Sequence, residues 1–245
     1  MIILIALDDT GNDRENHTGH VLRELGDLLE ENGLTGPGRI TAHPLMKEES
    51  LSTGQNRAFC LRTEAVEGAV DRLTAVARSF VDEHSGEGSR PGLCIVLPEI
   101  LDDRDRLINF GAKCLKNIVT PEQARVLADR LTGVFLSEHG AGDAGMIGAL
   151  AAAAFRLEGE QGIFFEPVRL PGGDCPRLAT VGELLELEGI DLVLETDGRD
   201  LELSDPVSLT GDLQPALHKG RAVLWVRDAG DLLIPLMGAR PESGH

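Results

Sequence analysis

The spacing of apolar and polar residues over the first 98 positions predicts alternating strands and helices. Runs of apolar residues bounded by polar loops indicate the strands, and apolar stripes at helical spacing indicate the helices. In order, the predicted elements are a strand at 2–7, a helix with its stripe at 21–29, strands at 39–44 and 57–63, a helix with its stripe at 66–80, and a strand at 93–97. This βαββαβ order is the split βαβ, or ferredoxin-like, pattern.

Residues 99–160 are predicted to be mainly helical. Apolar residues keep helical spacing from 107 to 118, and Thr120-Pro121-Glu122-Gln123 combines a Thr cap, a Pro at the first helical position and a Gln at the third. We expect the helix that follows to bury Val134 and Phe135. A glycine-rich loop over 139–145 then leads into an Ala-rich helix.

From residue 161 the pattern is rich in short strands. Residues 192–194 and 201–203 flank Asp197-Gly198, which is a hairpin signal, and residues 221–227 and 232–234 predict a second hairpin. A short helix is expected after Thr180, because Thr180 and Glu183 fit a capping box.

The pattern as a whole predicts an α/β (α+β) protein. We expect a ferredoxin-like βαββαβ unit over 1–98, a helical segment with a glycine loop over 99–160, and a strand-rich C-terminal part over 161–245.

The composition argues against several classes of protein. The net charge of −18 over 245 residues disfavours stand-alone binding to nucleic acid, and only seven Phe, one Trp and no Tyr are available to stack on bases. The four cysteines are far apart, which argues against a zinc ribbon or a disulfide scaffold. No stretch reads as a signal peptide or a membrane span, so we expect a cytoplasmic protein.

The first strand ends abruptly in acid, at Asp8-Asp9. Strand alternation places Asp8 on the face of Leu4 and Asp9 on the other face, so the two acids meet at one ligand only if the chain turns at Thr10-Gly11. Paired carboxylates at the end of a buried strand suit a divalent cation that carries phosphate oxygens. The alternative is a solvated turn, because Asp and Gly are common in turns.

Two further features suggest a phosphate site. Thr18 lies at a helix start, where free N–H groups favour anions, although a plain N-cap would also explain it. The loop Gly140-x-Gly142-x-x-Gly145 precedes a helix and suits a nest of backbone N–H groups, or a loop that needs positive φ angles. It also fits the dinucleotide pattern formally, but a helix is expected before it where that pattern requires a strand.

The polar loop Ser52-Thr53-Gly54-Gln55-Asn56-Arg57 precedes the third strand. Asn56 is a candidate contact for a base or phosphate, and a simple turn into the strand is the alternative. Nucleophile elbows, Walker A loops and zinc-protease motifs are absent from the sequence.

Together these motifs resemble the archaeal tRNA agmatinylcytidine synthetase (TiaS) family. The family's Gly-Ile-Asp-Asp-Thr-Asp-Ser is similar to residues 6–12, its Thr-Arg-Gly-Asn-Gly-Ala to residues 53–58, and its Gly-Arg-Gly-Leu-Ile-Gly-Ala-Leu-Ala-Ala to residues 143–152. Arg90-Pro91-Gly92 resembles the family's Asn-Pro-Gly. The resemblance covers about residues 1–160 and implies an ATP- and Mg²⁺-dependent kinase-like core.

By this resemblance, Asp8 and Asp9 bind the metal and Thr18 lies beside the γ-phosphate; we name these three as the catalytic candidates. Candidate nucleotide contacts are Thr10, Gly19, Asn56, Gly140, Gly142 and Gly145.

Three departures from the family's pattern limit how much of its function can be expected of this chain. Gly11-Asn12 replaces the family's Asp-Ser, Gly19 replaces one Thr of a pair, and the family's OB-fold and zinc ribbon have no counterpart. We therefore expect phosphoryl transfer or amine ligation on a small or partner-delivered substrate, without stand-alone tRNA modification. A non-catalytic ligand- or partner-binding protein of the same fold is the alternative, and a homodimer is left open.

Overall fold

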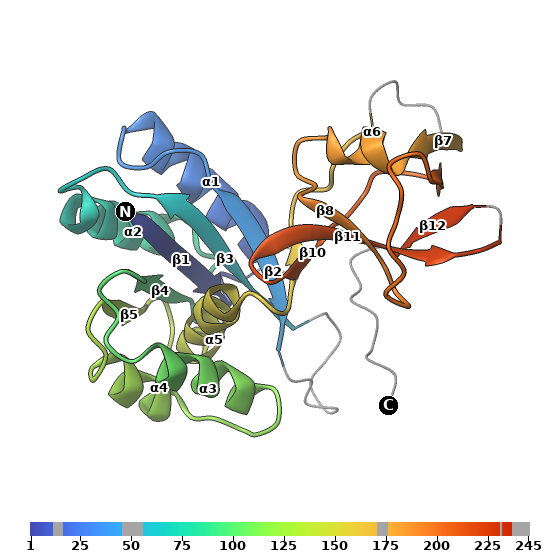
Figure 1. The fold of residues 1–245 in the computed structure, drawn as a ribbon. Helices are drawn as coiled ribbons and strands as arrows, with labels where there is room; N and C mark the ends of the chain where they lie inside the picture. The colour runs from blue at the N-terminus through green and yellow to red at the C-terminus, as the bar shows by residue number, and fades with distance from the viewer. Residues whose placement is uncertain (12–16, 46–55, 171–175, 231, 237–245) are drawn as a thin grey trace. The chain divides into compact units, whose positions relative to one another are not determined.

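The computed structural model describes residues 1–11, 17–45, 56–170, 176–230 and 232–236. The chain divides into two compact units, Met1–Glu158 and Gly159–His245 (Figure 1). Its mixture of helices and strands confirms the predicted α/β (α+β) class.

Unit 1 begins with the predicted βαββαβ order: β1 (Ile2–Asp8), α1 (His17–Glu31), β2 (Arg39–Pro44), β3 (Arg57–Glu64), α2 (Val70–His84) and β4 (Gly92–Val96). The sheet has the strand order β5-β4-β1-β3-β2, and each neighbouring pair is antiparallel. Since β3 separates β1 from β2 and β1 separates β3 from β4, each helical crossover spans an inserted strand, as the split βαβ pattern requires.

The rest of unit 1 adds α3 (Arg104–Cys114), α4 (Pro121–Ala128), β5 (Val134–Glu138) and α5 (Gly145–Glu158). Thr120 caps α4 through the predicted capping box. The prediction that this helix continues through Val134 and Phe135 is wrong, because α4 ends at Ala128 and both residues lie in β5. Gly133, at φ 79°, separates the two elements.

Two other predicted helical stripes are longer than the helices themselves. Val66 precedes α2 and is 49% exposed, and Ile118 follows α3 and is 75% exposed. Apolar spacing continues beyond each helix, but both side chains remain largely exposed.

One part of the core of unit 1 lies between the sheet and α5, and fully buried residues such as Ile5 of β1 and Leu22 of α1 form another. Leu4 and Ala6 of β1 share one apolar cluster with the Ala-rich length of α5 and with Phe155. Helices α1 and α2 pack together, and α1 contacts β1 and β3. Cys60, Cys94 and Cys114 are free thiols and are buried as small apolar side chains; Cys175 lies outside the described residues.

Unit 2 contains β6 (Ile163–Phe164), β7 (Arg177–Thr180), α6 (Val181–Leu185), β8 (Leu192–Glu195), β9 (Pro206–Leu209), β10 (Ala216–His218), β11 (Arg221–Asp228) and β12 (Leu233–Leu236). Their order is β6-β10-β11-β12-β9-β7, and β8 pairs with β11. The β11–β12 pairing confirms one predicted hairpin, and the capping box of Thr180 and Glu183 confirms the short helix.

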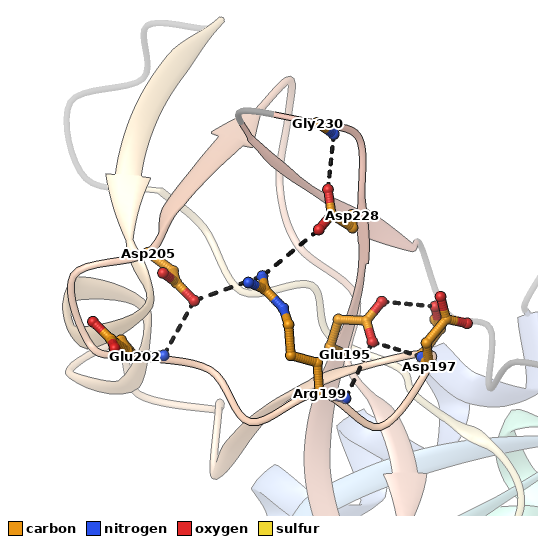
Figure 2. A network of polar contacts seen from close by, with 8 residues as sticks. Glu195, Asp197, Arg199, Glu202, Asp205, Asp228 and Gly230 are labelled. Atoms are coloured by element: carbon orange, nitrogen blue, oxygen red, sulfur yellow. Dashed lines mark hydrogen bonds and ion pairs between the residues drawn. The ribbon is translucent and has the colours of Figure 1, made fainter.

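The hairpin predicted around Asp197-Gly198 is wrong. β8 pairs in parallel with β11, and residues 201–203 form no strand. The turn is instead held by the buried carboxylate of Glu195, which accepts hydrogen bonds from the N–H of Asp197 at 2.6 Å and of Arg199 at 3.4 Å (Figure 2). The Arg199 guanidinium then lies between Asp205 and Asp228, at 3.7 and 3.9 Å.

Candidate functional site

The acidic end of β1 lies against the beginning of α5. Asp8 is the last residue of β1 and is half-buried on the face that α5 covers. Gly148 of α5 stands directly opposite, and a Cβ atom there would overlap Asp8 Oδ2. The glycine therefore allows the helix backbone to approach this carboxylate closely.

The chain turns over Asp9 to Gly11, the region where the two acids need a turn in order to meet at one ligand. Asp9 has a φ angle of 52°, in the left-handed region that residues other than glycine seldom occupy, and Gly11 follows at 71°. The Asp9 N–H donates a hydrogen bond of 2.9 Å to Asp8 Oδ1. This turn brings the two adjacent carboxylates into the same electrostatic environment, which an extended strand would have prevented.

Both carboxyl groups are harder to ionise than isolated ones. Burial, and then the charge of Asp9, raise the pKa of Asp8 from 3.8 to about 7. Burial also raises the pKa of Asp9, while the neighbouring Arg90 opposes that rise. This environment disfavours two negative charges, and a bound cation would stabilise the ionised form of both carboxylates.

Thr10 and Thr18 join the end of β1 to the beginning of α1. Thr10 is fully buried, and its hydroxyl donates to the Thr18 hydroxyl at 3.0 Å. Thr18 lies in the first turn of α1, and Gly19 is buried beside it. The predicted catalytic candidates Asp8, Asp9 and Thr18 are thus joined through three consecutive residues of β1 and its turn.

The glycine loop packs closely on the segment before β4. Ala141 N–H donates to Ser89 O at 2.9 Å and Gly145 N–H to Arg90 O at 3.0 Å. At Gly140, with φ 64°, and at Gly145, an added Cβ would lie 2.7 Å from Ser89 O and 2.5 Å from Arg90 O respectively. Gly145 therefore uses its amide within the protein, and close packing accounts for that glycine directly.

A strand, β5, precedes this loop, contrary to the predicted helix. The dinucleotide pattern also needs a parallel βαβ unit. β5 instead lies antiparallel to β4, and the pairs of the unit 1 sheet are all antiparallel. This topology argues against a Rossmann site.

Arg90 belongs to a stretch that resembles a family motif, but no site role was predicted for it. Its Nε lies 3.6 Å from Asp9 Oδ2, and its side chain is 58% exposed. The aliphatic part of Arg90 lies over Gly142, where an added Cβ would be 3.2 Å from Arg90 Cδ. Its sequence neighbours Pro91-Gly92 carried the resemblance, but only the turn at Asp9 shows that Arg90 faces an acid.

Asn56 lies at the same end of the sheet. It precedes β3, where its carbonyl accepts a hydrogen bond of 3.0 Å from Leu45 N–H. Leu7 pairs with Phe59, so the beginning of β3 and the end of β1 are adjacent. Asp13 and residues 46–55, which include Thr53 and Gly54 of the predicted polar loop, lie outside the described part of the chain.

The fold of this chain is found in solved structures of other proteins. No protein-family model matches the chain, and no curated protein matches it in sequence. Solved structures do match: apo TiaS, a tRNAIle2 agmatidine synthetase, aligns at TM-score 0.55 and 22% identity over 73% of this chain and 42% of its own. The TiaS–tRNA(Ile2)–ATP complex aligns at TM-score 0.57 and 20% identity over 89% and 53%.

The fold is that of about half of TiaS. A third structure, the TiaS–tRNA(Ile2)–AMPCPP–agmatine complex, agrees at TM-score 0.55 and 19% identity over 89% of this chain and 54% of that one. The chain therefore spans about half the length of the TiaS chains that it matches. The resemblance noted in the sequence is thereby confirmed at the level of the fold.

Proposed function

We propose that this protein binds ATP together with Mg²⁺ at the acidic end of β1 and uses it for phosphoryl transfer or amine ligation on a small or partner-delivered substrate. The observation that carries this proposal is the Asp8–Asp9 pair, two desolvated carboxyl groups held by a left-handed turn against the start of α5.

The donor set fits Mg²⁺ that arrives with a nucleotide. Within the described ranges, no group of three or more His, Cys, Asp or Glu side chains is placed to hold a metal. Mg²⁺ commonly uses one or two protein carboxylates and completes its shell with phosphate oxygens and water. Asp8 and Asp9 would supply the carboxylates, and the cation would supply the charge neutralisation that phosphoryl transfer needs.

The residues around the pair suit a polyphosphate. Thr18 is held at the first turn of α1, where backbone N–H groups and the helix dipole favour an anion. The Arg90 guanidinium next to Asp9 offers donors to phosphate oxygens, and the aliphatic part of Arg90 lies over Gly142. TiaS, which shares the fold, has been seen with ATP and with AMPCPP.

This arrangement acts by position and charge and does not need a protein nucleophile. Asp8 and Asp9 would orient the cation, Thr18 would orient the terminal phosphate, and Asn56 would contact the nucleotide from the beginning of β3. Chemistry of this kind depends mainly on alignment and charge stabilisation. The acceptor is left to a separate molecule, and a homodimer remains a prediction for size measurements in solution.

Binding of ATP is the direct test. We expect ATP with MgCl₂ to raise the melting temperature of the wild-type chain, and Asp8→Asn or Asp9→Asn to remove most of the shift. Asn is tolerated at left-handed φ angles, so Asp9→Asn removes charge and keeps the turn. Asp27→Asn, an exposed acid on α1, is the matched control. An equal shift in all four proteins would refute the proposed site.

A second measurement separates an enzyme from a binder. We expect ATP turnover or phosphate release to rise when a suitable amine or hydroxyl acceptor is present. ATP binding with no release or transfer over a broad set of acceptors would support the non-catalytic alternative.

A further inference from the structure

A hydrogen-bonded chain of three side chains joins the end of the edge strand β5 to α2, and the proposed nucleotide site does not use it. Ser137 Oγ lies 2.9 Å from His139 Nε2, and His139 Nδ1 lies 2.7 Å from Asp82 Oδ1. Ser137 lies near the end of β5, His139 directly follows that strand, and Asp82 comes from the last turns of α2. Helix α2 and strand β5 are both part of unit 1.

The hydrogen-bond roles along this chain follow from the carboxylate. A carboxylate only accepts, so His139 donates its Nδ1–H to Asp82 and keeps Nε2 as an acceptor. The Ser137 hydroxyl then donates to Nε2. A hydroxyl next to an imidazole that is in turn oriented by an acid is the arrangement that activates serine nucleophiles.

The three hydrogen-bonded side chains differ in how far each is exposed to solvent. The His139 side chain is only 2% exposed, so packing fixes its ring. Ser137 is partly exposed, and a small substrate can therefore reach its oxygen. The Asp82 side chain is 61% exposed, so water screens its hold on the imidazole, and we expect its contribution to be modest.

Strand pairing also supplies an amide donor beside the serine. His139 N–H donates to Pro91 O at 2.9 Å, and Ser137 is paired two residues along the same ladder, with Leu93. Hydrogen-bonded and non-bonded pairs alternate in antiparallel sheets, so the Glu138 N–H points away from β4. This N–H belongs to the residue after Ser137 and can donate to an oxyanion that forms there.

We propose that Ser137, His139 and Asp82 form a second site, which hydrolyses small carboxylic esters. Phe135 lies two residues before Ser137 on the same face of β5 and is 45% exposed, so it offers an apolar surface to the acyl group. The substrate class is therefore an ester of a short apolar acid with a good leaving group.

The reaction balances with water as the only co-reactant. Ser137 Oγ bonds to the ester carbonyl carbon while its proton moves to His139 Nε2. The carbon–oxygen bond to the alcohol breaks, and the alcohol leaves with that proton. Water then bonds to the acyl carbon while His139 takes a proton from it; the bond from that carbon to Ser137 Oγ breaks, His139 returns the proton to Ser137 Oγ, and the carboxylic acid leaves.

Covalent labelling of the full chain tests this site without relying on turnover. A fluorophosphonate probe should add to Ser137 in the native protein, as mapped by mass spectrometry of peptides, and p-nitrophenyl butyrate should be hydrolysed. Ser137→Ala should abolish both, while the exposed Ser79→Ala on α2, one turn from Asp82, should change neither.

Two further variants distinguish catalysis from mere support of the loop. Asp82→Asn should slow labelling by about tenfold. This is less than the roughly 10²–10⁴-fold contribution of a general base, because Asp82 is exposed and only orients His139. The melting temperature should stay nearly unchanged. His139→Gln should remove labelling, and circular dichroism should show that it remains folded. Absence of a Ser137 adduct overturns the proposal. Equal labelling of wild type and Asp82→Asn, or undiminished hydrolysis by Ser137→Ala, also overturns it.

Discussion

The hydroxyl of the fully buried Thr10 donates a hydrogen bond of 3.0 Å to the hydroxyl of Thr18, and so ties the end of β1 to the first turn of α1. This contact holds the first turn of α1 against the residue that follows the Asp8–Asp9 pair. Local capping rules give Thr18 a role within its own helix, whereas this bond gives it one between two elements.

Thr10→Val should therefore weaken both stability and nucleotide binding. Loss of a buried hydroxyl donor costs about 1 kcal/mol, which urea unfolding can measure. Thr10→Ser keeps the donor and should behave nearly as wild type in hydrogen bonding. If Thr10→Val binds ATP·Mg²⁺ as tightly as wild type, the bond has no part in ordering the site.

The raised pKa of Asp8 makes stability depend on pH. The native state keeps a proton on Asp8 up to about pH 7, whereas the unfolded chain loses it near 3.8. Without divalent cations, the contribution of Asp8 is therefore favourable at low pH and is lost as pH rises to about 7. Asp8→Asn should gain stability relative to wild type between pH 4 and pH 8, by roughly 4 kcal/mol at most.

Urea unfolding of both proteins at pH 5 and pH 8 in EDTA measures this difference. Asp9 interacts with Asp8 and titrates differently once Asp8 is replaced, whereas distant carboxyl groups titrate equally in the two proteins, so the change in the difference reports on the Asp8–Asp9 pair. A difference that stays constant between the two pH values would contradict the desolvated state of Asp8.

Gly148 tests the close contact between α5 and the acidic pair. An alanine Cβ would overlap the Asp8 carboxylate, with Leu45 Cδ1 also near, so Gly148→Ala must displace one of them. We expect a loss of about 1–3 kcal/mol, typical of overpacking, and weaker ATP binding. Gly36→Ala is the control, because a Cβ there meets no atom within 4 Å. Equal stability of the two variants would show that α5 does not constrain Asp8.

Arg90 provides a charge test of the same site. Because Arg90 lies 3.6 Å from Asp9, Arg90→Asn removes a cation that lowers the pKa of this acid. We expect the variant to bind the ATP triphosphate about tenfold more weakly, a change equivalent to about 1.4 kcal/mol, if the guanidinium meets phosphate oxygens. Adenosine affinity should change little, and calorimetry with both ligands would separate the two effects. Unchanged ATP affinity would limit Arg90 to pairing with Asp9.

Local sequence rules predicted the parts of this fold that depend on neighbours in the chain. The capping boxes at Thr120 and Thr180 formed as expected, because each needs only four consecutive residues. The alternation in β1 correctly placed Asp8 on the face of Leu4, which α5 covers. Fold class followed from the order of such elements.

The errors occur where pairing over long distances overrides local spacing. Val134 and Phe135 continue a helical stripe, but pairing with β4 draws them into a strand. Leu192–Leu194 precede a good turn signal, yet β8 pairs with β11, about 30 residues onward. The same limit hid Arg90 and the Ser137–His139–Asp82 contacts, since only the folded chain brings Asp82 to β5.

The left-handed backbone at Asp9 has a consequence for how this site would respond to selection. Glycine adopts a φ angle of 52° without steric strain, so Asp9→Gly should raise the free energy of unfolding by about 1 kcal/mol. The same change removes a carboxylate from the site. A search for thermostable variants should therefore favour this change, and a screen for ATP binding should eliminate it. Position 9 is where stability and chemistry make opposite demands on a single residue.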